Sequence, residues 1–273
     1  MSGELEGRKA LVTGSSAGIG EATARRLARE GAAVAVHGRN RERAEKVAAE
    51  IRAAGGHAIV AIGDLKDPAQ SAEVCAIVGK EFGDIDILVN NAGGESSGMG
   101  TGPWFETSPE QWESTYRANV VSIVRMIQHF VPGMKRKGWG RIVQVSSASA
   151  YHAWPQIPDY QAAKSGLSNL TRSLVMALAN TGITANTVTP GFILTETNKG
   201  WLKTMGKARG WDVEDFDALL KRVITEWMPT PSGRVGVPDD VAQAIAFLVS
   251  PASGHINGVN IPVTGGSLML AGA

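Results

Sequence analysis

The sequence has 273 residues, of which 43% are hydrophobic and 19% are charged, and its formal net charge is +1. These values suit one globular domain spanning 1–273, and the absence of a long basic run argues against a nucleic-acid partner. The first ten residues lack the apolar region of a signal peptide, and no apolar stretch approaches the ~20 residues of a membrane span. The single cysteine, Cys75, has no partner for an internal disulfide. We therefore expect a cytoplasmic protein that does not bind membranes.

Short apolar segments alternate with helical patterns along nearly the whole chain. The expected strands are 9–13, 34–37, 57–62, 85–89, 141–145, 183–188 and 259–263. The helices between them are expected to end near residues 30, 53, 82, 132, 181 and 249, with Pro132 ending or kinking the fourth. Residues 192–235 look irregular or weakly helical. This alternation predicts an α/β fold with a doubly wound parallel sheet that helices cover on both faces.

Distinctive residues follow almost every expected strand. They are the turn 14–20, Arg39, Asp64, the turn 90–93, Ser147 and the segment 190–195. The carboxyl ends of parallel strands meet at one edge of the sheet, and ligands of such folds bind beyond that edge. The sequence therefore predicts that these segments form one site.

The turn after the first strand reads TGSSAGIG and opens a helix. Its glycines allow a tight turn and a close approach to a pyrophosphate, whose charge meets the helix N-terminus. The second strand ends in HGRN, without the acid that usually binds the ribose 2′-hydroxyl of NAD. Arg39 is instead placed to bind a 2′-phosphate, and Asp64 to accept a hydrogen bond from the adenine amine. A solvated Arg39 and a helix-capping Asp64 are the alternatives.

Tyr160 and Lys164 are four residues apart, so on a helix they share one face. A free phenol titrates near ~10, and a neighbouring ammonium group lowers that pKa. Such a phenol can exchange a proton with a reacting oxygen at neutral pH. Ser147 ends the fifth strand and would face this helix. A Tyr and Lys pair at this spacing also occurs on solvated helix faces, so the motif gains weight from the rest of the chain.

Taken in order, TGSSAGIG, Asp64, NNAG, Asn119, Ser147, YQAAK and PGFILT resemble the motifs of the short-chain dehydrogenase/reductase superfamily over nearly the whole chain. The resemblance implies a single Rossmann-type domain. It also implies an oxidoreductase that interconverts a ketone and a secondary alcohol by hydride transfer with a nicotinamide cofactor. The missing acid beside Arg39 indicates the branch that prefers NADP(H) over NAD(H).

The resemblance also implies a role for each matching residue. Tyr160 would be the acid/base, and Ser147 would hold the substrate oxygen. Lys164 would bind the nicotinamide ribose and lower the pKa of Tyr160, and Asn119 would support a water relay. No metal is expected. The implied cofactor contacts are Gly14, Ser15, Ser16, Gly18, Ile19, Gly20, Arg39, Asp64, Leu65, Asn91, Ala92, Gly93, Tyr160, Lys164, Pro190, Gly191, Ile193 and Thr195.

In this family residues 192–235 would form a substrate lid, and here the segment is rich in tryptophan. His152 and Trp154 lie between Ser147 and Tyr160 and are candidate substrate contacts. An aromatic wall favours a bulky, largely apolar carbonyl or alcohol. The alternative is that the lid tryptophans pack the lid itself or a subunit interface.

Other activities and states are also weighed. A 3-oxoacyl-carrier-protein reductase would dock an acidic carrier, for which 135–137 (KRK) could serve, but Thr181 stands where a basic residue is frequent. A catalytically silent NADP-binding regulator is a further alternative. An epimerase or dehydratase of the extended branch fits less well. The family also implies a homotetramer in which helices near 110–135 and 158–180 pair across an interface, although Thr264 replaces a frequent Asp.

Overall fold

The computed structural model describes residues 3–94, 104–152 and 154–270. Within these residues the chain forms a seven-stranded sheet in the order β3-β2-β1-β4-β5-β6-β7, and every neighbouring pair is parallel. The strands are β1 (Lys9–Val12), β2 (Ala33–Gly38), β3 (Ala58–Ile62), β4 (Ile87–Asn90), β5 (Gly140–Val145), β6 (Ile183–Pro190) and β7 (Asn260–Val263). All seven predicted strands are therefore present.

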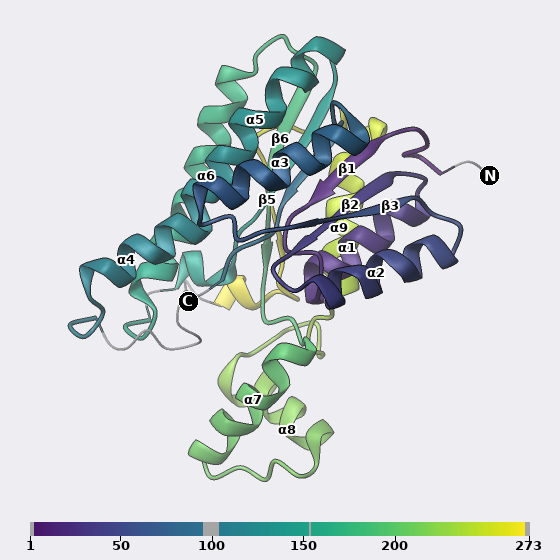
Figure 1. Ribbon diagram of the computed structural model, residues 1–273. Helices are drawn as coiled ribbons and strands as arrows, with labels where there is room; N and C mark the ends of the chain where they lie inside the picture. Colours follow the sequence, from purple (N-terminus) through teal and green to yellow (C-terminus); the bar gives the residue numbers. More distant parts are fainter. Residues whose placement is uncertain (1–2, 95–103, 153, 271–273) are drawn as a thin grey trace.

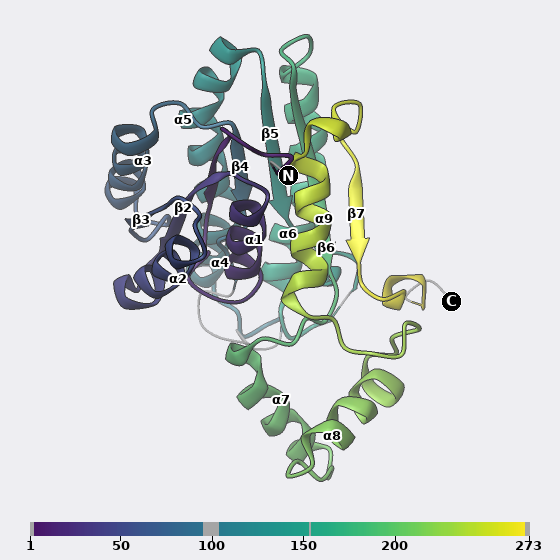
Figure 2. The same ribbon diagram turned by 90° about the vertical axis from the view of Figure 1, so that its right-hand side faces the viewer.

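Helices cover both faces of the sheet (Figures 1 and 2). One face carries α1 (Gly18–Arg29), α2 (Arg41–Ala53) and α9 (Pro238–Val249), and the other carries α3 (Pro68–Phe82), α5 (Ser122–Lys137) and α6 (Pro158–Ala177). Successive strand residues enter alternate cores: Val34 and Val36 join the first, and Ala35 joins the second. This double coverage explains the nearly continuous apolar strands.

The helix predicted to end or kink at Pro132 does not end there, because α5 continues through this residue. The structure has α4 (Pro109–Tyr116), a π-helical turn (Arg117–Val121) and then α5, which ends at Gly138 in the left-handed conformation with φ 64°. Pro132 lies on the exposed side, whereas Val131 and Met134 are buried in the core. Their burial outweighs the hydrogen bond that proline removes.

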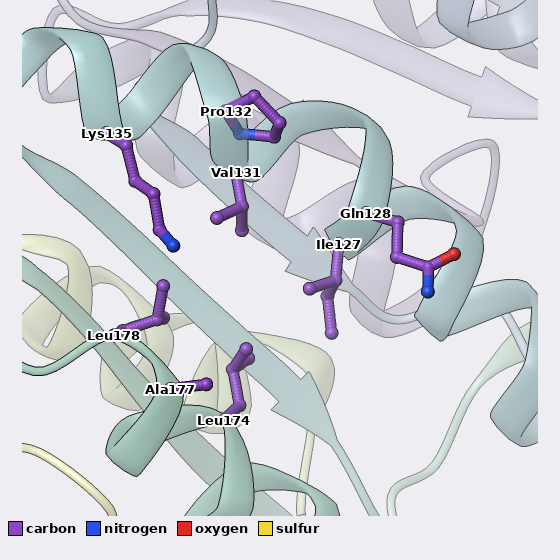
Figure 3. A pocket seen from close by; sticks show the side chains of 8 residues that line it. All are labelled: Ile127, Gln128, Val131, Pro132, Lys135, Leu174, Ala177 and Leu178. Carbon is purple, nitrogen blue, oxygen red and sulfur yellow. The ribbon is translucent and has the colours of Figure 1, made fainter.

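A surface groove separates α5 from α6 (Figure 3). Its lining is apolar apart from Gln128 and Lys135, and Ile127 and Val131 of α5 point toward Leu174 of α6 across it. The lining residues are Ile127, Gln128, Val131, Pro132, Lys135, Leu174, Ala177 and Leu178.

The lid is more ordered than its sequence pattern predicts. It contains α7 (Glu196–Ala208), α8 (Phe216–Arg222) and a π-helical turn (Val223–Trp227), and it extends from the carboxyl edge of the sheet (Figure 1). A small core of Leu202, Val213, Leu219 and Val223 holds it together, with aromatic side chains around it. At its base Ile193 pairs with Gly236, so the two ends of the lid meet.

Three short helices complete the described residues. They are the 3-10 helices Ala148–Tyr151, Pro251–Ser253 and Ser267–Leu270. The cysteine Cys75 lies in α3 and is 3% exposed, and burial raises its pKa to about 11. It is therefore a small core residue, as the helical pattern around it suggests.

Candidate active site

The predicted acid/base pair lies at the carboxyl edge of the sheet, where α6 begins beside the end of β5. The Lys164 Nζ is 5.6 Å from the centre of the Tyr160 ring. Lys164 is only 3% exposed and donates a hydrogen bond of 3.0 Å to the Val145 carbonyl oxygen. Ser147 lies two residues after the end of β5, and its Oγ accepts a hydrogen bond of 3.1 Å from the Ser149 N–H. The solvated-helix interpretation of Lys164 is therefore excluded by its burial.

Burial also sets the charge state of Lys164. Loss of water around the ammonium group lowers its pKa to about 8. At pH 7 the side chain remains mostly protonated, yet it loses its charge within one or two pH units. Lys164 is thus a cation held in a poorly solvated place, with N–H groups beyond the one given to Val145.

Asn119 lies in the π-helical turn between α4 and α5 and is fully buried. Its Nδ2 donates to the carbonyl oxygens of Thr115 (2.9 Å) and Gly94 (2.8 Å), and its Oδ1 accepts from the Gly94 N–H (3.0 Å). The extra residue in such a turn redirects a side chain and is common at functional sites. Here it points the amide toward the end of β4.

Gly93 brings Asn119 and Lys164 close together. A Cβ on Gly93 would lie 2.7 Å from the Asn119 Oδ1 and 3.3 Å from the Lys164 Nζ. Only glycine at position 93 leaves space for both the Asn119 amide and the Lys164 ammonium group beside the backbone. The NNAG turn therefore joins the candidate catalytic residues to the rest of the edge.

The Gly-rich turn has the geometry of an anion site. Gly14 and Gly18 have φ values of 66° and 57°, which favour glycine. A Cβ on Gly20 would lie 2.3 Å from the Gly14 carbonyl oxygen. Helix α1 starts at Gly18, and the leading amides of a helix have no partners within it. These amides, which include that of Ile19, are free to meet a pyrophosphate.

Two serines of this turn take different positions. Ser15 is fully buried, its Oγ bonds Val12 and His37, and its N–H donates to the His37 carbonyl oxygen. Ser15 therefore shapes the turn and keeps no free donor of its own. Ser16 places its Oγ over Gly38, where a Cβ would lie only 2.6 Å away. The hydroxyl of Ser16 is thus next to Arg39.

Arg39 and Asp64 follow the ends of the neighbouring strands β2 and β3. Arg39 is exposed. The Asp64 Oδ1 accepts a hydrogen bond of 3.0 Å from the Lys66 N–H. The Leu65 side chain is buried, and its carbonyl oxygen accepts from Arg125 at 3.1 Å. Leu65 can therefore offer a ligand little beyond its N–H.

The remaining predicted cofactor segments also reach the Gly-rich turn. Asn91 donates from its Nδ2 to the Thr13 carbonyl oxygen at 2.9 Å, and the N–H of Ala92 donates to the Thr13 Oγ1 at 2.9 Å. After β6, which ends at Pro190, the chain passes Gly191 and Ile193 to Thr195. The Thr195 Cγ2 would lie 3.3 Å from a Cβ on Gly18. The structure thus brings the segments 13–20, 90–93 and 190–195 together.

The two predicted substrate contacts form a stacked pair. The rings of His152 and Trp154 are 5.4 Å apart at 18°, and Trp154 is 41% exposed. The lid tryptophans behave differently, because Trp201 packs on Trp227 at 5.2 Å and the Arg209 guanidinium lies 3.9 Å from the Trp227 ring centre. Most of the lid aromatics therefore stabilise the lid rather than line a wall.

Two positions were missed by the sequence analysis. The buried carboxylate of Asp159, directly before Tyr160, accepts a hydrogen bond of 2.5 Å from the Thr115 hydroxyl and so joins α6 to α4. The adjacency of Asp159 to the YxxxK motif was a usable signal. His37 lies buried beneath the Gly-rich turn, and a polar residue near the end of a buried strand was the signal there.

The described residues contain no cluster of three His, Cys, Asp or Glu side chains suited to a metal ion. In the same part of the chain no helix is both long and apolar enough to cross a bilayer.

The parallel sheet, its Gly-rich turn and the polar groups at its carboxyl edge define a Rossmann-type nucleotide-binding fold. The family model for short chain dehydrogenases matches residues 8–206, about three quarters of the chain, and the chain belongs to this family of oxidoreductases.

Relatives of full length support this assignment. The chain is 34% identical to a 3-oxoacyl-(acyl-carrier-protein) reductase of Vibrio cholerae, over 97% of this chain and 99% of that protein. It is 35% identical to a D-threitol dehydrogenase of Mycolicibacterium smegmatis, over 96% and 93%. The structure of the L-sorbose reductase from Gluconobacter frateurii, complexed with NADPH and L-sorbose, matches with a TM-score of 0.89 at 30% identity, over 98% and 99% of the two chains.

Proposed function

We propose that this protein is an NADP(H)-dependent oxidoreductase that interconverts a ketone and a secondary alcohol. The observation that carries the proposal is the gathering of Ser147, Tyr160, Lys164 and Asn119 at the sheet edge that also holds the Gly-rich turn. When bound, the nicotinamide supplies the hydride. The residues of this chain bind and orient the reactants and move the proton.

Tyr160 is the proposed acid/base. In the reductive direction its phenol gives a proton to the carbonyl oxygen while the carbon receives the hydride, so the ketone becomes a secondary alcohol. The Ser147 hydroxyl accepts from the Ser149 N–H and keeps its own proton available for the substrate oxygen. The positive charge of Lys164 stabilises the phenolate that remains on Tyr160. The phenolate becomes a phenol again when it takes up a proton. Asn119 holds the turn that brings these groups together.

The cofactor preference is proposed from Arg39. It is exposed just after the end of β2 and follows Gly38, against which the Ser16 hydroxyl lies. The end of this strand has no Asp or Glu that could bind the ribose 2′-hydroxyl of NAD. A guanidinium can bind a 2′-phosphate with two parallel hydrogen bonds. The sorbose reductase, which has the same fold and was solved with NADPH, supports the same preference.

The proposed substrate is a bulky, largely apolar small molecule. The exposed Trp154 ring, stacked on His152 one short loop before Tyr160, supports this proposal. A carrier-linked acyl substrate has support from the Vibrio relative. Against it, Arg136 and Lys137 already bind Asp84 and Asp86. They also lie at the end of α5, 17 and 18 residues or ~26 Å of helix away from Asn119.

We further propose that the protein assembles as a homotetramer and that the groove between α5 and α6 is covered by a second copy (Figure 3). The groove is apolar and both helices present side chains to it, which favours a helix-to-helix contact.

The decisive experiment is a panel of ketones and alcohols offered with each cofactor, followed by absorbance at the nicotinamide band. We expect turnover with at least one bulky ketone, higher kcat/KM with NADPH than with NADH, and loss of ~10²-fold or more in Tyr160→Phe. Arg39→Asp should reverse or remove the cofactor preference. Equal kcat/KM for both cofactors would contradict the NADP(H) assignment. Binding of NADPH without turnover on any substrate would favour the silent regulator.

A further inference from the structure

His37 lies 3% exposed on β2, directly under the Gly-rich turn. The Gly14 N–H donates a hydrogen bond of 2.9 Å to its Nδ1, and its Nε2 is 3.1 Å from the Gly63 carbonyl oxygen. The backbone of His37 is tied to the same turn, because its N–H donates to the Ser15 Oγ at 2.9 Å and its carbonyl oxygen accepts from the Ser15 N–H at 2.7 Å. One side chain thus connects the segments that follow β1 and β3.

The partners of His37 determine where its proton resides. A backbone N–H can only donate and a backbone carbonyl can only accept, so Nδ1 is unprotonated and Nε2 carries the hydrogen. A second proton on the ring would set one N–H against another at Gly14. The imidazole therefore works only as the neutral Nε2–H form.

We propose that His37 is a positioning residue of the dinucleotide site, whose neutral ring holds Gly14 in place and so fixes the turn that presents the α1 amides to a pyrophosphate. The inference rests on the proposed dinucleotide site and explains how this chain shapes it. Because His37 acts on the turn and not on the 2′-phosphate, it sets the affinity for NADP(H) and NAD(H) alike. Arg39 acts on the first of these alone.

The surroundings of His37 keep its ring neutral. Burial lowers its pKa to about 4, and the positive charge of Arg39 adds to this effect, whereas the Gly63 carbonyl oxygen and the Asp64 carboxylate oppose it. The ring of His37 is therefore neutral, and its hydrogen bond from the Gly14 N–H is kept, at any pH at which the protein would work.

Three variants separate this role from simple packing. His37→Phe fills a similar volume but leaves the half-buried Gly14 N–H without its acceptor, so the turn loses the hydrogen bond that holds it. His37→Asn keeps an acceptor close to the position of Nδ1, and His37→Gln keeps a donor close to that of Nε2. His57→Phe is the matched control, because the His57 ring packs on the Phe82 ring, away from the Gly-rich turn, and His57 precedes β3 at the opposite edge of the sheet.

The test is the dissociation constant of NADPH, NADH and 2′,5′-ADP for each variant, together with cofactor KM and kcat. We expect His37→Phe to raise the dissociation constants of NADPH and NADH by a common factor of roughly tenfold and to act on KM more than on kcat. His37→Asn should recover most of the affinity, His37→Gln little, and His57→Phe should match the unmutated protein. Unchanged affinity in His37→Phe would overturn the inference.

A second measurement needs no variant. In ¹⁵N-histidine NMR of the ligand-free protein, His37 should show the Nε2–H form and no titration between pH 8 and pH 5. The Nδ1–H form, or a titration near the ordinary histidine value, would also overturn the inference. An unmutated protein that binds no dinucleotide would instead overturn the proposed function, and this role of His37 with it.

Discussion

Lys164 carries its charge where the protein leaves almost no room for water. The one described hydrogen bond of its ammonium group is to a neutral carbonyl oxygen, so the charge is held at a cost in free energy. This cost can be measured because it disappears when the proton leaves. The residue proposed to support Tyr160 therefore also gives the free energy of unfolding a specific pH dependence.

The first prediction compares the ligand-free protein with Lys164→Met. The folded-state pKa is about 8 against 10.5 for a free lysine, so the unfolded chain binds more protons between these values. Stability attributable to Lys164 therefore rises as the pH increases from 8 to 10.5, by up to about 3 kcal/mol at ~1.4 kcal/mol per pKa unit. Urea unfolding of both proteins from pH 7 to 10.5 measures the difference. A difference that stays constant over this range would show that Lys164 keeps its ordinary pKa.

At the scale of single residues, the sequence predicted the reactive side chains but not the residues that hold them in position. Tyr160, Lys164 and Ser147 follow from spacing and from the end of a strand, which are local properties. The contacts of Asn119 with Thr115 and Gly94 depend on a π-helical turn, which no periodicity announces. The buried His37 and Asp159 were missed because their partners are 23 and 44 residues away along the chain.

Among the elements, the lid departs most from its predicted form. Its helices are short, and isolated helices of this length are marginal in water. They are held by a small aliphatic core, by the aromatic side chains packed around it, and by guanidinium groups that lie over these rings. Arg209 is 3.9 Å from the Trp227 ring centre and Arg222 is 4.7 Å from that of Trp211. The pattern was weak because these contacts join α7 to the π-helical turn rather than to residues one turn away.

The second prediction concerns Trp227→Leu. Removing this ring takes away the contacts with Trp201 and Arg209, so we expect the lid to loosen while the sheet stays intact. Amide hydrogen exchange should become faster over 196–227, and substrate KM should rise several-fold with little change in Tm.

Trp139→Leu is its control. Trp139 lies between the guanidinium groups of Arg8 and Arg141 at the amino edge of the sheet, at 3.8 and 4.3 Å. This variant should lower Tm and leave exchange in the lid unchanged. Equal exchange rates of the lid in Trp227→Leu and the unmutated protein would show that the contacts of the Trp227 ring do not hold the lid.

For the whole molecule, the alternation of apolar segments and helical patterns predicts seven strands in a parallel sheet covered on both faces, and the structure contains that sheet. The order of the strands was not predicted, because alternation along the chain does not say which strands become neighbours. Assembly could not be predicted from periodicity, because a helix that faces a partner and one that faces its own core have the same pattern. Of the apolar residues that line the groove between α5 and α6, Pro132 and Ala177 are exposed and Leu174 is half-buried, so these remain available after folding.

The third prediction tests this groove. A carboxylate in the middle of an apolar helix contact is costly, so Leu174→Glu should dissociate the assembly. Light scattering at micromolar protein should give a tetramer or dimer mass for the unmutated chain and a smaller mass for the variant.

The matched control is Arg172→Glu, an exposed α6 position outside the groove lining, which should keep the native mass. A monomeric unmutated protein would contradict the proposed assembly.

The meeting of the lid ends at Ile193 and Gly236 bears on how such proteins diversify. The Leu194 N–H also donates to the Gly236 carbonyl oxygen at 2.8 Å, so the sheet meets the lid as a loop that is already closed at its base. Doubling the length of a closed loop costs only about 0.6 kcal/mol in chain entropy. The segment between these two residues can thus be lengthened, shortened or transplanted from a relative with little effect on the sheet. Evolution could change the range of accepted substrates by exchanging this lid segment alone, while the proton-transfer residues and the nucleotide site stay the same.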